Sequence, residues 1–209
     1  MWGKIENKKI IKLYGGPEML KDANGTQYPT SIFDNNDKLK DFNIYPCIDS
    51  NNPPIYTELY NNGGESFAWN ESKSQIDKTY NYSAKKVDDE NAKMEDGSDM
   101  KDDYGRVMIN RGIKTILKDN VRRMQKELLS TTDQWIIRKA DTGDDIPTTV
   151  AKYRSDVRTA ATTMETAIDK IKDIDGAILL LTPIFNKDGT IKTPATLYDF
   201  PHEPDGMPT

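Results

Sequence analysis

The second half of the chain spaces its apolar residues three or four positions apart, as one face of an α-helix does. The first run goes from Ile113 to Leu128 and predicts a helix that ends near Leu129. Residues 130–133, Ser-Thr-Thr-Asp, then offer hydroxyls and a carboxylate as N-caps for a short helix over residues 134–140.

The longest run of this kind extends from Val150 to Leu181 at alternating three- and four-residue steps, with mainly charged residues and threonine between. Because this register continues for more than four heptads, it predicts one long helix of coiled-coil type. Pro147 suits the first turn of that helix, Gly176 interrupts the pattern locally, and Pro183 ends it.

Residues 1–82 follow a different pattern, in which aromatic and polar residues alternate between turn signals. Residues 2–13 predict two short strands around a turn at residues 6–8, and Asn24-Gly25 suits a type I′ turn. Residues 44–48 predict an edge strand, because Pro46 has no N–H to donate to a neighbouring strand.

Together these patterns predict an α+β protein in four parts. A small β-rich N-terminal module (1–82) is joined by an acidic linker (83–103) to a helical domain (104–182), and an extended tail (183–209) follows. The helical domain consists of a helix, a short helix and the long heptad helix. The linker is predicted from clustered aspartate and glutamate with little to bury. We find no internal repeat in the sequence.

The composition is polar for a compact globule: 30% of the 209 residues are charged, 35% are hydrophobic, and the mean hydropathy is -0.77. This favours an elongated protein, or one that completes its core in an oligomer. The net charge of -5 and the lack of a long lysine–arginine run argue against nucleic acid as a partner. The longest apolar run is too short to span a bilayer, so we expect no membrane partner.

Few residues suggest catalysis or metal binding. Cys47 is the only cysteine, which excludes a cysteine zinc cluster and fits folding in a reducing cytosol. His202, the only histidine, lies in the predicted tail, with no nucleophile that the sequence places beside it. The acidic run from Asp141 to Asp145 lacks the spacing of a calcium loop. We therefore predict no catalytic residue, no metal site and no cofactor.

Tyr153, Arg154 and Arg158 form a distinctive group near the start of the heptad helix, with the two arginines one turn apart on one face. One interpretation is that the arginines make surface ion pairs with Asp156, Asp133 or Asp144 and Asp145. The other is that they clamp the preceding short helix, with Trp135 packed on Tyr153, and serve as an interface anchor.

The heptad stripe also has two interpretations. It packs within one chain against the helix over residues 113–128, or it joins chains in a coiled coil. The candidate oligomerisation residues are Val150, Val157, Met164, Ile171, Ile174 and Ile178. The β-branched residues at both a and d positions among them favour three or more strands over two.

The helical region also carries a motif. Its parts are Arg123-x-x-x-x-Leu128-Leu129-x-x-Thr132-Asp133-x-Trp135, then Ile146-Pro147, then Tyr153-Arg154-x-x-Val157-Arg158. This order and spacing resembles the C-terminal domain of phage tail assembly chaperones, also called tail fibre assembly proteins. Here Val157 stands where the family usually has leucine. The ending Leu197-Tyr198-Asp199-Phe200-Pro201-x-Glu203-Pro204 is similar to the Trp/Phe-Pro-x-x-Pro ending of such proteins.

The resemblance implies a non-enzymatic protein of a tailed phage, made in the host cytoplasm and acting at the virion tail. Its partners would be tail fibre or baseplate proteins, bound through Trp135, Tyr153, Arg154 and Arg158. Family members usually end soon after the second arginine, whereas this chain continues. That continuation keeps open an alternative: a permanent virion subunit (a fibre, adaptor or baseplate-peripheral protein) that forms homo-oligomers through a coiled coil. A third class, a glycan-degrading enzyme, would need paired carboxylates in a deep cleft, which so polar a chain disfavours.

Overall fold

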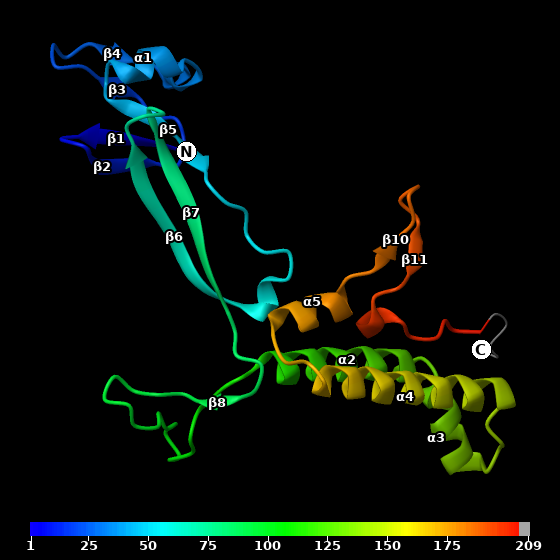
Figure 1. The fold of residues 1–209 in the computed structure, drawn as a ribbon. Helices are drawn as coiled ribbons and strands as arrows, with labels where there is room; N and C mark the ends of the chain where they lie inside the picture. Colours follow the sequence, from blue (N-terminus) through cyan, green and yellow to red (C-terminus); the bar gives the residue numbers. More distant parts are fainter. Residues whose placement is uncertain (205–209) are drawn as a thin grey trace. The chain divides into compact units, whose positions relative to one another are not determined.

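The computed structural model describes residues 1–204, and the chain divides into two compact units, residues 1–83 and 84–209. The α+β class predicted from the sequence is confirmed, since strands dominate the first unit and helices the second (Figure 1).

The first unit is built on a five-stranded sheet with the order β2-β1-β5-β7-β6. The strands are β1 (Trp2–Glu6), β2 (Lys9–Tyr14), β5 (Ile44–Asp49), β6 (Tyr60–Asn70) and β7 (Gln75–Ala84). The turn between β1 and β2 has positive φ at both central residues, Asn7 (49°) and Lys8 (63°), as a type I′ turn requires. At Asn24-Gly25 only the glycine has positive φ, so the type I′ turn predicted there is wrong.

Smaller elements cover one part of this sheet. They are β3 (Leu20–Lys21), β4 (Gln27–Tyr28), η1 (Thr30–Asp34) and α1 (Asn36–Lys40). A further short helix, η2 (Thr57–Leu59), lies away from them, directly before β6 (Figure 1). Helix α1 starts where the side chain of Asn35 accepts hydrogen bonds from the backbone N–H groups of Asp37 and Lys38. The core consists of Tyr14, Leu20, Ile32, Phe33, Leu39 and Ile44, with Trp2, Tyr28 and Phe42 partly buried against it.

Strand β5 lies in the middle of the sheet, so its prediction as an edge strand is wrong. The reason is that β5 changes neighbours at Pro46. It pairs with β1 through residue 46 and with β7 only from Cys47 onward. The N–H of Cys47 donates to Met1 on the β1 side, so position 46 faces the other side, before the pairing with β7 begins. The missing N–H of Pro46 therefore costs the sheet no hydrogen bond.

The second unit starts with a three-armed β segment rather than the acidic linker expected over 83–103. Strands β8 (Glu90–Asn91) and β9 (Ile109–Asn110) pair with each other, and isolated bridges join Lys93 to Asp99 and Lys101 to Val107. At the centre three backbone hydrogen bonds form a ring: Ala92 N–H to Met108, Met108 N–H to Met100, and Met100 N–H to Ala92, each 2.8 Å.

The ring reveals a repeat of eight residues that sequence inspection missed. The turn closed by the Met94 N–H to the Ser98 carbonyl recurs as Asp102 N–H to Arg106, each at 2.9 Å. Gly97 and Gly105 take the same place in the two turns, with φ of 83° and 78°. Side chains recur only in part at this spacing: Lys93 as Lys101, Gly97 as Gly105 and Met100 as Met108. With two copies and few shared residues, the repeat is clearer in the backbone than in the sequence.

Helices α2 (Ile113–Ser130), α3 (Asp133–Thr142), α4 (Thr148–Asp169) and α5 (Ile174–Leu181) follow. Helices α2 and α4 lie side by side and antiparallel, with α3 at the end where they are connected (Figure 1). Their interface buries Ile113, Leu117 and Val121 of α2. On α4 the buried side chains are Val150, Tyr153, Arg154, Val157, Ala161, Met164 and Ile168.

The heptad run does not form one helix, so that prediction is wrong: α4 ends at Asp169 and α5 begins at Ile174. The break comes from Asp173, whose carboxylate accepts a 2.8 Å hydrogen bond from the Gly176 N–H and caps α5. Gly176 lies inside α5 and is not the residue that interrupts the helix. Ile171 stays buried in the connection, which preserves the apolar spacing across the break.

The last described part contains a short hairpin and a docked segment. Strands β10 (Ile184–Phe185) and β11 (Ile191–Thr193) pair, and η3 (Thr196–Tyr198) follows. Leu197 is buried, so this segment packs against the helices of its unit, as expected of a docked tail. Of the tail predicted over 183–209, residues 205–209 lie outside the described residues.

Candidate partner-binding surface

Arg154 connects three points of the corner between α2 and α3. Its Nη1 donates to the Leu129 carbonyl at 2.8 Å, to the Thr132 hydroxyl at 2.7 Å and to the Asp133 carboxylate at 2.9 Å. Arg154 and Thr132 are both buried. Because Leu129 lies in the last turn of α2 and Asp133 begins α3, one guanidinium fixes the start of α3 against α4.

This arrangement combines both interpretations made from the sequence. Arg154 does pair with Asp133, and it also holds the short helix as a clamp. Thr132 is one of the four residues, 130–133, that the sequence offers as N-caps of the short helix, and it occupies the N-cap position of α3. Its side chain makes no capping hydrogen bond, because its hydroxyl donates to Leu129 and accepts from Arg154.

Helix α3 buries none of its own side chains. Ile136 and Ile137 are 39% and 67% exposed, and Trp135 is half-buried. The guanidinium of Arg138 stacks on the indole of Trp135, 4.7 Å from the ring centroid. At its far end the helix stops at Gly143, whose φ of 81° is the left-handed conformation favoured by glycine. The α3 surface, defined here as Trp135, Ile136, Ile137 and Arg138, is thus rigidly held and apolar, with one stacked cation.

The four predicted partner-binding residues occupy different environments. Trp135 and Arg158 are accessible, whereas Tyr153 and Arg154 are only 2% and 7% exposed. Among the described residues Trp135 stacks with Arg138, and no ring contact joins it to Tyr153. Burial raises the pKa of the Tyr153 hydroxyl, with a smaller contribution from Glu203. Any direct contact of Tyr153 or Arg154 with a partner would therefore require the unit to open.

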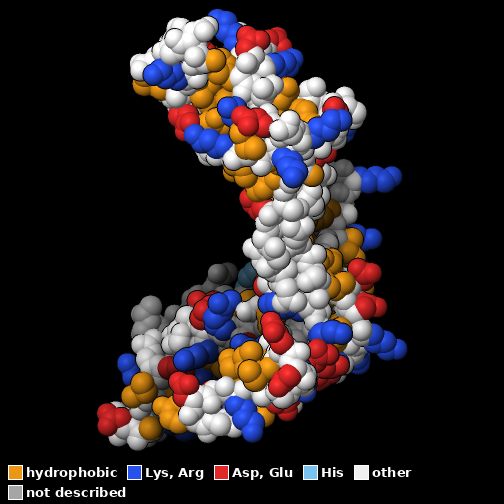
Figure 2. Space-filling model, turned by 90° about the vertical axis from the view of Figure 1, so that its left-hand side faces the viewer, with side chains coloured by type: hydrophobic (Ala, Val, Ile, Leu, Met, Phe, Trp, Pro, Cys, Tyr) orange, Lys and Arg blue, Asp and Glu red, His pale blue; other side chains and the backbone are white. Residues whose placement is uncertain are grey.

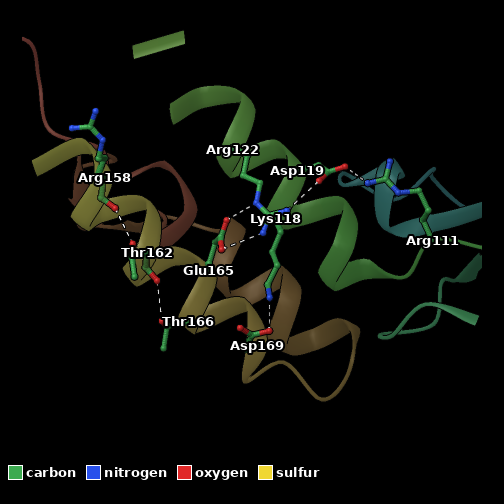
Figure 3. A network of polar contacts seen from close by, with 9 residues as sticks. All are labelled: Arg111, Lys118, Asp119, Arg122, Arg158, Thr162, Glu165, Thr166 and Asp169. Carbon is green, nitrogen blue, oxygen red and sulfur yellow. Dashed lines mark hydrogen bonds and ion pairs between the residues drawn. The ribbon is translucent and has the colours of Figure 1, made fainter. Parts of the chain in front are cut away.

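A row of ion pairs fixes the register of α2 against α4 (Figure 3). Lys118 pairs with Asp169 at 2.6 Å, and one turn further Arg122 pairs with Glu165 at 2.7 Å. The pairing with Glu165 raises the pKa of Arg122, so its charge is held. Arg158 differs: its guanidinium points away from this row, and within residues 1–204 it has no carboxylate partner.

The candidate oligomerisation residues are mostly occupied within the chain. Val150, Val157, Met164 and Ile171 are buried, with exposures of 5% or less. Ile174 and Ile178, on α5, are half-buried. The intrachain interpretation of the stripe accounts for the first four, and Ile174 and Ile178 retain accessible surface.

Sequence reasoning missed Ile137 and Arg138 as surface residues. The available signal was the spacing of Trp135 and Arg138, three residues apart on one helix face. Other apolar side chains are exposed elsewhere in the chain, and Figure 2 shows such side chains at several places on the face it draws. Exposure alone therefore does not single out α3; its clamp does.

Other kinds of site find little support. In the described part of the chain no group of three or more His, Cys, Asp or Glu residues is placed to hold a metal ion. Burial raises the pKa of the Cys47 thiol, which disfavours the reactive thiolate form. His202 is exposed. None of the helices between residues 1 and 204 combines the length and apolar character needed to cross a membrane.

Comparison with known protein families, curated proteins and solved structures finds no match to this chain.

Proposed function

We propose that this chain is a non-enzymatic protein of a tailed-phage tail that binds other tail polypeptides, as an assembly chaperone or as a retained adaptor. The α3 corner supports this proposal. Residues that carry the family resemblance, namely Leu129, Thr132, Asp133 and Arg154, are distant in sequence yet meet in one hydrogen-bonded joint. The motif therefore corresponds to one structural device, and that device presents Trp135.

The chemistry of the α3 surface indicates what kind of segment it binds. Ile137 and Trp135 offer apolar area, and Arg138 lies beside them without a carboxylate partner among the described residues. A matching partner segment would present apolar side chains flanked by aspartate or glutamate. Because α3 is already fixed by Arg154, binding would cost little ordering of the helix.

The test is binding of the full chain to a purified tail fibre protein, measured by calorimetry and light scattering. Ile137→Glu and Trp135→Ala should each weaken binding at least tenfold, while the unfolding midpoint in urea stays near that of the wild type. Leu179→Glu is the matched control, since Leu179 is 72% exposed on α5 of the same unit. If all variants bound equally well, or if the wild type did not bind, the α3 surface would not be the binding site for the tail fibre protein.

A second candidate, a permanent virion subunit that forms homo-oligomers, is favoured by the exposed area. The chain exposes 14151 Å², whereas two separate globules of these sizes would expose about 12,000 Å² together. The β10–β11 hairpin contributes to the difference, with Ile184, Phe185 and Ile191 each more than half exposed. Two-stranded hairpins are marginally stable alone, so a covering surface would stabilise this one. Recovery of the protein from purified virions at a fixed copy number, and its self-association in solution, would favour this candidate.

A further inference from the structure

The first unit contains a cavity that the proposed function does not use. It has a volume of about 470 Å³, within the range of small-molecule sites. Its walls come from β1, the β3–β4 region, η1 and the end of α1, all within residues 1–83. Tyr28 and Phe42 form the aromatic part of the wall, with ring centroids 5.1 Å apart in an edge-to-face pair, and Ile32 lies among the lining residues.

Lysine side chains line the same cavity. Lys21 and Lys38 have no carboxylate partner among residues 1–204, whereas Lys4 forms an ion pair with Glu6 at 3.2 Å. The contrast with Lys40 is informative, because that neighbour on α1 is paired with Asp37 at 2.8 Å and does not line the cavity. Two ammonium groups thus border an aromatic pocket, and neither is in an ion pair among the described residues.

Two acidic residues, Asp22 and Asp41, line the cavity as well, and neither forms an ion pair with Lys21 or Lys38 among the described residues. Asp22 is committed to its own turn, since it accepts from the N–H groups of Asn24 and Thr26 and from the Tyr28 hydroxyl. Asp41 is also a lining residue, and its carboxylate accepts no hydrogen bond from another side chain between residues 1 and 204. A ligand that pairs with both kinds of group therefore needs an anionic group for Lys21 and Lys38 and a hydroxyl group that donates to Asp41.

Asn43 adds a backbone feature at the same place. Its φ of 57° is in the left-handed region, which costs energy for a residue other than glycine. The turn that holds it is fixed by the Asn43 N–H to Lys40 and by the Ile5 N–H to the Asn43 carbonyl, at 2.9 and 2.8 Å. Asn43 is one of the lining residues, and its side-chain amide has no hydrogen-bond partner in the described part of the chain.

From this arrangement we infer that the cavity binds an anionic sugar unit. Its carboxylate or phosphate would be held by Lys21 and Lys38, its hydroxyls by Asp41 and Asn43, and its apolar C–H face by Tyr28 and Phe42. A neutral sugar would leave the two ammonium groups unpaired, and a simple inorganic anion would leave the aromatic wall unused. The cavity lies in the first unit and the α3 surface in the second. The sugar-binding inference therefore does not depend on the proposed binding of tail proteins.

The experiment adds three probes to the full chain: methyl β-D-glucuronide, glucose 1-phosphate and the neutral methyl β-D-glucoside. Binding is followed by amide chemical shifts and calorimetry up to about 10 mM, where a ligand of millimolar affinity is largely bound. At least one anionic probe should shift amides around Tyr28 and Asn43, at least tenfold more tightly than the glucoside. Which anionic probe binds distinguishes a carboxylated from a phosphorylated sugar.

Variants assign the binding to these residues. The double variant Lys21→Gln/Lys38→Gln should weaken binding at least tenfold, whereas Lys9→Gln, on the exposed β2 strand, should leave it unchanged. Asn43→Gly keeps the left-handed backbone and removes only the amide, so it should fold and weaken binding several-fold. The inference is overturned if neither anionic probe shifts these amides, if the glucoside binds equally well, or if the lysine double variant binds like the wild type.

Discussion

The guanidinium of Arg154 donates to the carboxylate of Asp133, 21 positions earlier in the sequence, at 2.9 Å, and the same nitrogen also donates to the Thr132 hydroxyl and the Leu129 carbonyl. Only Nη1 makes these bonds, and Nε is buried without a partner in the described structure. The arginine therefore stabilises one specific position of α3 while leaving part of its own hydrogen-bonding capacity unused. These hydrogen bonds predict the effect of replacing Arg154 on the stability of the helical unit.

Replacing Arg154 by methionine should destabilise the helical unit by about 2 to 3 kcal/mol, because the Leu129 and Thr132 oxygens lose a charged donor. Methionine retains much of the apolar stem and removes the unpaired Nε, which limits the loss. Urea unfolding followed by circular dichroism measures the change. Lys152→Met removes the exposed pair with Asp156 and should cost less than about 0.5 kcal/mol. Equal costs for the two variants would contradict the clamp.

The heptad stripe can be tested for intrachain packing through Val157, which is 0% exposed. Val157→Ala should cost about 1 to 2.5 kcal/mol in unfolding free energy through lost burial and the cavity left behind. Because its contacts lie within the chain, this loss should not depend on protein concentration. Leu179→Ala, at an exposed position, should change stability little in the monomer. A loss at Val157 that varies with concentration would instead place the stripe between chains.

The α2–α3 corner could be foreseen because each of its signals is local in sequence. The apolar period ends near Leu129, polar N-cap residues follow, and an arginine recurs one turn after Arg154. That the arginine clamps the helix was one of two open interpretations, since its partner lies far along the chain. The exposed position of Ile137 was not foreseeable, because a short amphipathic helix normally buries such a residue.

Two other parts of the fold escaped the sequence for physical reasons. The three-armed segment is held by backbone hydrogen bonds among Ala92, Met100 and Met108, which require only a partial side-chain repeat, such as Gly97 and Gly105. The break between α4 and α5 keeps Ile171 buried, so the apolar spacing continues where the helix does not. The spacing of apolar residues indicates which side chains face the core. It does not indicate whether the backbone between them is continuously helical.

Two substitutions distinguish the possible causes of the break between α4 and α5, namely the Asp173 cap and Gly176. Asp173→Ala removes the side-chain cap of α5 and should cost about 1 kcal/mol. Gly176→Ala should be neutral or stabilising by up to about 1 kcal/mol, since alanine favours a helix interior and its Cβ would meet Asp173 Oδ1 at 3.4 Å. Urea unfolding gives both values. If Gly176→Ala proved the more damaging change, the glycine rather than the cap would define the start of α5.

The start of α2 should show a pH dependence that depends on Asp89. Its carboxylate accepts a 2.7 Å hydrogen bond from the Gly112 N–H, and this bond, followed by one from Thr115, lowers the pKa of Asp89. The ionised form is therefore favoured in the folded state. Its stabilising effect is present above the unfolded pKa, about 3.9, and is lost as the pH falls through the lower folded value.

Asp89→Asn retains an oxygen acceptor and removes the charge that complements the N-terminus of α2. The stability difference between wild type and variant should be largest near neutral pH and should shrink as the pH falls below about 4. Asp96, Asp99 and Asp102 also have lowered pKa values, so both proteins should lose stability in acid. The difference between the two proteins isolates Asp89, and urea titrations at several pH values measure it. A difference that stays constant with pH would show that hydrogen bonding alone, without the charge, holds the start of the helix.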